Sequence, residues 1–156
     1  KPDGLLMAAL PCEGTLFELK TALLEAESEV SSGAANRVEL FAPIRQLGDL
    51  MQKTSFKLPV VDLEERTIRY SRFMSLINDL RNMGASNLEA ANVPALSRAV
   101  FQKAEDIYVE KFGDSDGKIR ASVNLAFLSG WKEDASQQKP LKPGSAKTSL
   151  ADALKP

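Results

Sequence analysis

The stretch that decides the fold is Leu5-Leu6-Met7-Ala8-Ala9-Leu10, which follows Lys1-Pro2-Asp3-Gly4 and precedes Pro11. Pro-Asp-Gly is turn chemistry, and a continuous apolar run between two turns is typical of a strand buried on both faces of a parallel sheet. Such a strand needs a neighbour on each side, because an open apolar edge promotes aggregation. We therefore expect the chain to be the carboxy-terminal part of a longer protein. In any ordered state, the edge of residues 5–10 is expected to be covered, most simply by the same strand of a second copy in a homodimer.

The composition sets limits on the function. The chain has 156 residues, 20 basic and 21 acidic side chains, a net charge of −1 and no histidine. The near-neutral charge argues against nucleic acid or a membrane surface as the main partner. The lack of histidine excludes Ser-His-Asp and Cys-His nucleophiles, histidine metal sites and a histidine general base. Cys12 is the only cysteine, so an intrachain disulfide and a thiolate metal cluster are excluded, which fits a cytoplasmic location.

The first half of the chain alternates strand and helix patterns. A capping-box pattern at residues 15–18 predicts a helix that runs to about Val30. Pro43 suits the first turn of a second helix, which has an apolar face to about Lys53. Residues 56–70 are strand-like and form either one long kinked strand or two short ones.

The second half of the chain again has two helix patterns followed by a strand pattern. Ser71 is placed to cap a helix that ends at Gly84, and Pro94 to open a helix that ends at Gly113. Strict alternation of apolar and polar residues over 119–127 predicts a strand. The fold class is therefore α/β, and the crossover between the first two strands predicts that they run parallel to each other.

Several pieces, in this order, resemble the second half of a class I S-adenosylmethionine-dependent methyltransferase. The group includes the malonyl-carrier-protein methyltransferases of biotin synthesis and a mitochondrial assembly factor for respiratory complex I. Asp79-Leu80-Arg81-Asn82-Met83-Gly84-Ala85-Ser86-Asn87 resembles a helix end in its inserted region. Gly130-Trp131 with residues 136–146 resembles the tail of alphaproteobacterial members. The other matching pieces are residues 1–6, 15–19 and 58–62.

The resemblance implies a Rossmann-like sheet of which this chain holds strands five to seven, with helices on its faces and a helical insertion between the last two strands. Residues 1–131 then form the end of the methyltransferase domain, with 71–117 as a lid and substrate wall, and residues 132–156 form an extended polar tail. In this family the last strand runs antiparallel to its neighbours.

The cofactor half is expected to be missing. The family holds S-adenosylmethionine with a glycine-rich turn after the first strand, and this sequence contains no Gly-x-Gly. The resemblance places that turn before Lys1, so we expect the chain alone to bind no cofactor and to be inactive. Its role would be substrate binding and lid closure, with a hydroxylase or assembly role also open. The alternative is a non-enzymatic α/β interaction module that pairs through its first strand.

Ligands of open α/β sheets lie outside the carboxyl ends of the parallel strands. Together with the resemblance, this rule gives a set of candidate substrate-binding residues, Glu13, Tyr70, Asp79, Arg81 and Asn87. Each also has a structural interpretation: a solvated acid for Glu13, surface charges for Asp79 and Arg81, and a turn former for Asn87. The acceptor would be a small molecule or a group bound to a carrier protein.

Four further residues have a structural interpretation, and three of them also have a functional one. Cys12 is either a reactive thiol or a packing residue. Trp131 anchors the end of the last strand. Lys139 and Lys142 either meet an acidic carrier protein or belong to a solubilising tail.

Overall fold

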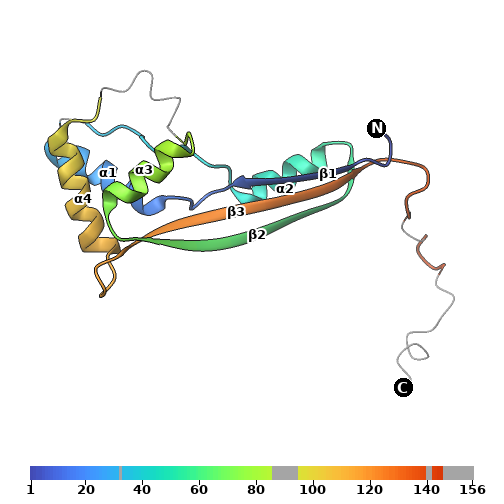
Figure 1. Cartoon of the computed structure of the whole chain (residues 1–156). Helices are drawn as coiled ribbons and strands as arrows, with labels where there is room; N and C mark the ends of the chain where they lie inside the picture. The colour runs from blue at the N-terminus through green and yellow to red at the C-terminus, as the bar shows by residue number, and fades with distance from the viewer. Residues whose placement is uncertain (32, 86–94, 140–141, 146–156) are drawn as a thin grey trace.

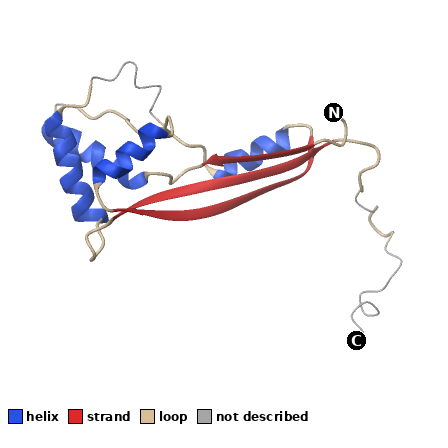
Figure 2. Ribbon diagram, in the orientation of Figure 1, coloured by secondary structure: helices blue, strands red, loops and turns tan. Residues whose placement is uncertain are grey.

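The computed structural model describes residues 1–31, 33–85, 95–139 and 142–145 (Figures 1 and 2). In this part of the chain, strands and helices follow one another in the predicted order, which confirms an α/β fold. They are β1 (Leu5–Pro11), α1 (Phe17–Val30), α2 (Ile44–Lys53), β2 (Phe56–Tyr70), α3 (Phe73–Asn82), α4 (Arg98–Phe112) and β3 (Ile119–Lys132).

The sheet has the order β1-β3-β2, and β3 runs antiparallel to both neighbours. β1 and β2 are therefore parallel to each other, as predicted, but β3 lies between them. The antiparallel direction of the last strand is confirmed. β2 is one continuous strand with a register shift between Lys57 and Val60, so the single-strand alternative for residues 56–70 is correct.

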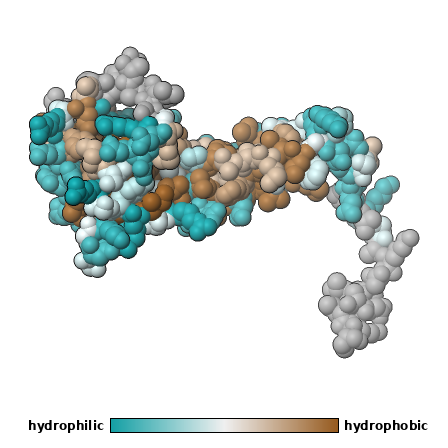
Figure 3. All heavy atoms as spheres, viewed as in Figure 1, coloured by the Kyte–Doolittle hydropathy of each residue, from teal (hydrophilic) through white to brown (hydrophobic). Residues whose placement is uncertain are grey.

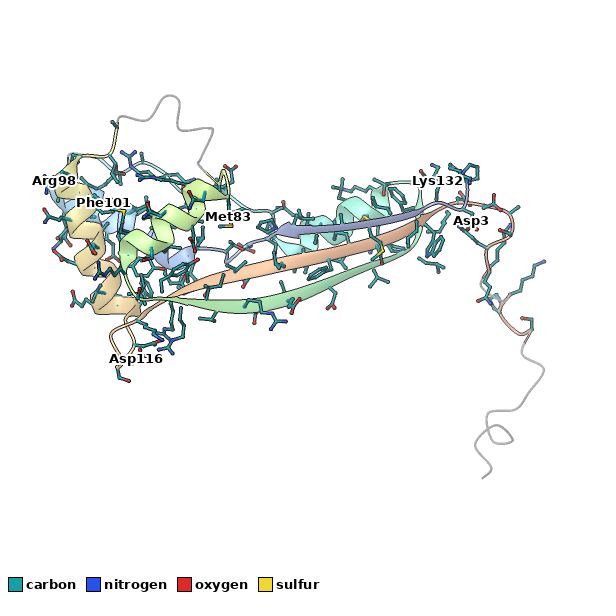
Figure 4. All side chains as sticks on the ribbon, in the orientation of Figure 1. Asp3, Met83, Arg98, Phe101, Asp116 and Lys132 are labelled. Atoms are coloured by element: carbon teal, nitrogen blue, oxygen red, sulfur yellow. The ribbon has the colours of Figure 1, made fainter. Side chains whose placement is uncertain are left out.

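The molecule is elongated, with α1, α3 and α4 forming a helical body at one end of the sheet (Figure 1). This is the end at which β1 and β2 finish and β3 begins. α2 lies along the sheet farther from the helical body, over a small second core that contains Cys12, Leu47 and Ala126. Figure 4 shows Arg98 and Phe101 in the helical body, and Asp3 and Lys132 together at the opposite end.

The prediction that the first strand is buried on both faces is wrong for this chain. Along β1 the side chains alternate between exposed and half-buried, and Met7 is 75% exposed. The reason is that β1 pairs only with β3 and is an edge strand in the described structure. The even-numbered Leu10 packs against the core that contains Leu47 of α2, whereas the odd-numbered Met7 lines an open hollow.

The buried positions of the last strand, β3, switch from one face of the sheet to the other along its length. Ile119 and Ala121 are buried against the helical body, as predicted, but Phe127 is 40% exposed while Ala126 is buried. The helical body packs on one face near the start of β3, and α2 packs on the other face farther along. Periodicity alone did not reveal this switch.

The predicted capping box at the start of α1 is also wrong. The residue before the helix, Leu16, has a φ of 56° and makes no side-chain cap. Thr15 instead hydrogen-bonds the backbone of Asn124, and the Glu18 carboxylate accepts hydrogen bonds from the amide and hydroxyl of Ser122. Both side chains bond to β3 and do not cap the helix. The reason is that β3 runs beside this segment and its backbone groups need hydrogen-bond partners.

The two later helices begin differently from the predictions, although α3 ends as expected. Ser71 is not a cap, because Arg72 occupies that position and no side chain caps α3. Gly84, at φ 70°, ends α3 with a Schellman pattern in which its amide donates to the carbonyl of Arg81. Pro94 lies outside the described residues, and α4 begins at Arg98 behind the capping hydroxyl of Ser97.

Candidate functional site

The loop after β1 delivers the chain to the helical body in a fixed path. The amide of Cys12 donates to the carbonyl of Asn124 at 2.9 Å, and the amide of Leu16 donates to that of Ser122 at 2.8 Å. Gly14, at φ 92°, turns the chain between these bonds. The loop therefore continues the pairing with β3 past the end of β1 and carries Glu13 at the carboxyl end of the strand.

A buried ion pair joins α1 to the loop that follows it. The Glu27 carboxylate accepts hydrogen bonds from Nε of Arg37 at 2.7 Å and from the amide of Ala35 at 2.7 Å, and Nη2 of Arg37 lies 2.5 Å from Oε1. The two side chains are 6% and 16% exposed, the lowest values among the ion pairs that the structure describes. One carboxylate thus holds both a guanidinium and the loop backbone in place.

Arg37 lines a pocket of about 190 Å³ between α1, this loop and the end of α3. The wall is mainly apolar with two charged side chains, which is the usual make-up of a small-molecule site. The lining residues are Leu16, Leu19, Arg37, Val38, Glu39, Phe41, Leu80 and Ala85.

Glu27 and Arg37 also line a second hollow, of about 380 Å³, with the capping residue Ser97 and with Val100 of α4. The contacts with Glu27 use Nε and Nη2 of Arg37. The guanidinium has five N–H donors in a planar fork, and those on Nη1 take no part in these contacts with Glu27.

The structure brings two of the predicted site residues together. Tyr70 ends β2, and its hydroxyl lies close enough to Asp79 on α3 for that side chain to affect its pKa. Burial, and then the charge of Asp79, raises the pKa of the Tyr70 hydroxyl. The two residues lie where α3 follows the end of β2.

The other predicted site residues are separate. The Glu13 side chain is exposed, and its backbone carbonyl accepts a hydrogen bond from Nδ2 of Asn124. Arg81 is exposed on α3, and Asn87 lies outside the described residues. None of the four described candidates lines the 190 Å³ pocket, and their roles in substrate binding stay predictions.

The remaining candidates fall into two places. Cys12 is 1% exposed beside Leu47 and Ala126, and burial raises the pKa of its thiol, as expected for a packing residue. Trp131, near the end of β3, and Lys139 lie at the far end of the sheet from the pocket, and Lys142 is exposed.

The sequence analysis missed Glu27 and Arg37. One signal was available, because Glu27 shares the apolar stripe of α1 with Leu19, Leu23 and Ala26. A glutamate at such a position must be paired when it is buried. Its partner could not be named, since Arg37 lies in a loop with no periodic pattern.

Two classes of site and segment are absent from the described residues. In that part of the chain, no group of three or more Asp, Glu or Cys side chains is placed to hold a metal ion. No helix there is long and apolar enough to cross a membrane.

Comparison with known proteins finds relatives along nearly the whole chain, although no protein-family model matches it. Arginine-hydroxylase NDUFAF5 of Danio rerio is 35% identical over 99% of this chain, and that of Dictyostelium discoideum is 38% identical over 97%. Malonyl-acyl-carrier-protein O-methyltransferase of Methylovorus sp. is 29% identical over 90%.

These relatives are longer than the chain. The matches cover 48%, 35% and 45% of the three relatives, so the chain spans about half of their length or less. The arginine-hydroxylase relatives are mitochondrial proteins. Both groups that the sequence resembles are represented, and the resemblance is confirmed.

Proposed function

We propose that this chain, a homologue of malonyl-acyl-carrier-protein O-methyltransferases and of arginine-hydroxylase NDUFAF5, is the carboxy-terminal portion of a class I S-adenosylmethionine-dependent methyltransferase domain. In this proposal β1, β2 and β3 are its fifth, sixth and seventh strands. The observation that carries it is the position of β3, the last strand, which runs antiparallel between two mutually parallel strands.

The cofactor would be held by the other half of the protein. When bound, S-adenosylmethionine supplies the methyl group. The glycine-rich turn that holds this cofactor in the family has no counterpart among the residues of this chain. This chain would contribute the wall of the acceptor site and, through residues 71–117, the lid. α3 and α4 stand at the carboxyl ends of β1 and β2, where ligands of open α/β sheets bind.

The pocket beside Arg37 suits an acceptor that carries a carboxylate. A malonyl group ends in one, and the planar guanidinium of Arg37 matches its geometry. Glu27 holds the guanidinium from behind, while Leu19 and Leu80 provide apolar walls for the acyl chain. In this proposal the pocket accepts either a small molecule or an acyl group bound to a carrier protein.

A second candidate is hydroxylation of an arginine side chain, favoured by the identity of 35% and 38% to the arginine-hydroxylases. Such a substrate is a cation. Glu39, an exposed carboxylate at the same pocket, would then be the recognising group. The two candidates therefore differ in the charge of the ligand and in the side chain that reads it.

The fragment proposal is tested by cofactor binding. Isothermal titration with S-adenosylmethionine is run on this chain and on the same chain extended by the coding sequence upstream of Lys1. We expect binding only by the extended chain. Binding by this chain alone would contradict the proposal. An extended chain that binds no S-adenosylmethionine would favour the alternative function, a non-enzymatic module that pairs through β1.

The acceptor is tested by amide shifts of the ¹⁵N-labelled extended chain on addition of malonyl-pantetheine or acetyl-arginine-amide. We expect shifts around residues 35–41 with the malonyl probe, abolished by Arg37→Met and kept in Arg45→Met, a control on the exposed side of α2. Shifts with the arginine probe alone, lost in Glu39→Gln, would favour the hydroxylase.

A further inference from the structure

The Arg37 guanidinium is held in one orientation by the Glu27 carboxylate. Its Nε donates to Oε1 of Glu27 at 2.7 Å, and its Nη2 lies 2.5 Å from the same oxygen. The other oxygen, Oε2, accepts a hydrogen bond from the amide of Ala35 at 2.7 Å, so the loop backbone fixes the carboxylate in turn. A side chain that is already fixed loses little conformational freedom when a ligand binds to it.

This guanidinium is part of the wall of the 190 Å³ pocket, near the end of α3 where Figure 4 labels Met83. The outer surface of the helical body is polar, with apolar residues between the polar ones (Figure 3). The Arg37 side chain is 16% exposed, and Leu19 and Leu80 line the same wall. Contacts with a charged ligand are therefore screened less by water here than at the surface.

Two carboxylates oppose the binding of an anion. Glu27 balances the charge of Arg37, and Glu39 lines the same pocket with an exposed side chain. The pocket is therefore not a general trap for anions. An anionic ligand has to bind through the planar N–H fork of the guanidinium, which acts at contact distance and in one direction. Such binding depends on where the guanidinium is held, and so on Glu27.

We infer that Glu27 is a positioning residue whose hold on Arg37 makes the pocket select a free carboxylate over its neutral methyl ester. The inference rests on the proposed function, in which methyl transfer to the acceptor oxygen would turn an anion into a neutral ester. A neutral ester accepts only the weaker hydrogen bonds of an uncharged group from the guanidinium. The site that binds the substrate would thereby release the product.

The experiment measures the affinity of the extended chain for three probes by isothermal titration in the absence of cofactor. The probes are malonyl-pantetheine, its terminal methyl ester and its terminal amide, which is similar in size to the acid but uncharged. We expect the acid to bind more tightly than either neutral probe by about tenfold or more. Equal affinity for the acid and a neutral probe, or no binding of the acid, would overturn the inference.

Glu27→Gln tests the positioning role. The variant keeps the size of the side chain, but its single oxygen cannot replace the two that hold Arg37 and Ala35. We expect the preference for the acid over the ester to fall about fivefold or more. An equal loss of affinity for all three probes would indicate a merely structural role, and a stronger preference for the acid would indicate that Glu27 acts only through its charge. Either result would overturn the positioning role.

Two further variants complete the comparison. Arg37→Lys keeps a positive charge without the planar fork, so it should lose most of the preference for the acid. Arg45→Met, on the exposed side of α2, is the control and should leave the preference unchanged. The comparison of the three probes on the unaltered extended chain needs no variant, so the inference stays testable if a variant does not fold.

The outcomes keep this inference separate from the proposed function. Selection of the acid by an extended chain that binds no S-adenosylmethionine would support the carboxylate site and contradict only the methyltransferase assignment. Binding of S-adenosylmethionine without selection of the acid would support that assignment and overturn the inference.

Discussion

Tyr70, the last residue of β2, faces Ile119, the first residue of β3, across the sheet. The whole segment 71–118 therefore leaves and re-enters the sheet at one point. Arg69 reinforces the junction, because its guanidinium binds Asp114 at 2.8 Å and Asp116 at 2.6 Å in the turn before β3. α3 and α4 are thus held at the end of the sheet where β1 and β2 finish.

The buried ion pair between Glu27 of α1 and Arg37 of the following loop should be strongly coupled in its effect on stability. Arg37→Met leaves Glu27 buried without its partner, so we expect a loss of about 3–5 kcal/mol in the free energy of unfolding. Adding Glu27→Met should recover much of this loss. Urea unfolding of both single variants and the double variant measures the coupling, and additive losses would contradict it. Lys103→Met, which breaks the exposed pair with Glu29, is the control and should have a much smaller effect.

Alkaline pH should destabilise the protein through Tyr108. Its buried hydroxyl donates to the carbonyl of Arg120 at 2.7 Å, and burial, followed by the charge of Glu18, raises the pKa of this hydroxyl. The folded state therefore keeps the proton that the unfolded chain loses near pH 10, and the associated stability is complete below about pH 10 and falls above it.

Urea unfolding at about pH 8 and about pH 11 measures this loss. Tyr108→Phe should cost about 1 kcal/mol at the lower pH and reduce the alkaline loss. Tyr70→Phe keeps Tyr108 and should retain most of the loss. An unchanged alkaline loss in Tyr108→Phe would show that another group is responsible.

Two glycines should respond to alanine with opposite signs. At Gly14, φ is 92° and an added Cβ would lie 2.4 Å from Nδ2 of Asn124, so Gly14→Ala should destabilise by about 1–3 kcal/mol. At Gly48, inside α2, an added Cβ meets no atom within 4 Å. Gly48→Ala should stabilise by about 0.5–1 kcal/mol. Thermal melts of both variants test the pair, and equal signs would be inconsistent with this loop geometry.

The start of α4 should depend on one hydroxyl. The Ser97 side chain accepts a hydrogen bond from the amide of Val100 at 3.2 Å. Ser97→Ala should lower the free energy of unfolding by about 1 kcal/mol. Ser115→Ala, in an exposed turn, is the control and should leave the urea midpoint unchanged. No loss in Ser97→Ala would mean that the helix begins elsewhere.

The candidate site was harder to predict than the elements around it. Tyr70 and Asp79 were named from the resemblance and lie together, because Tyr70 ends β2 and α3, which carries Asp79, follows it directly. The pocket that contains Arg37 was missed, since it is built from a helix end and a loop with no periodic pattern. Pairing of a buried charge is a property of three-dimensional neighbours and has no fixed spacing in sequence.

The sequence by itself determined the order of the elements, the α/β class and the exclusion of histidine chemistry. These follow from local periodicity, turn residues and composition, which act over a few neighbouring positions. Only the tertiary structure decided which way Thr15 and Glu18 turn, which face of β3 is covered at each point, and that β1 has an open edge. Those outcomes depend on which backbone groups lie beside each other across the sheet, where β3 competes with the local cap for the same side chains.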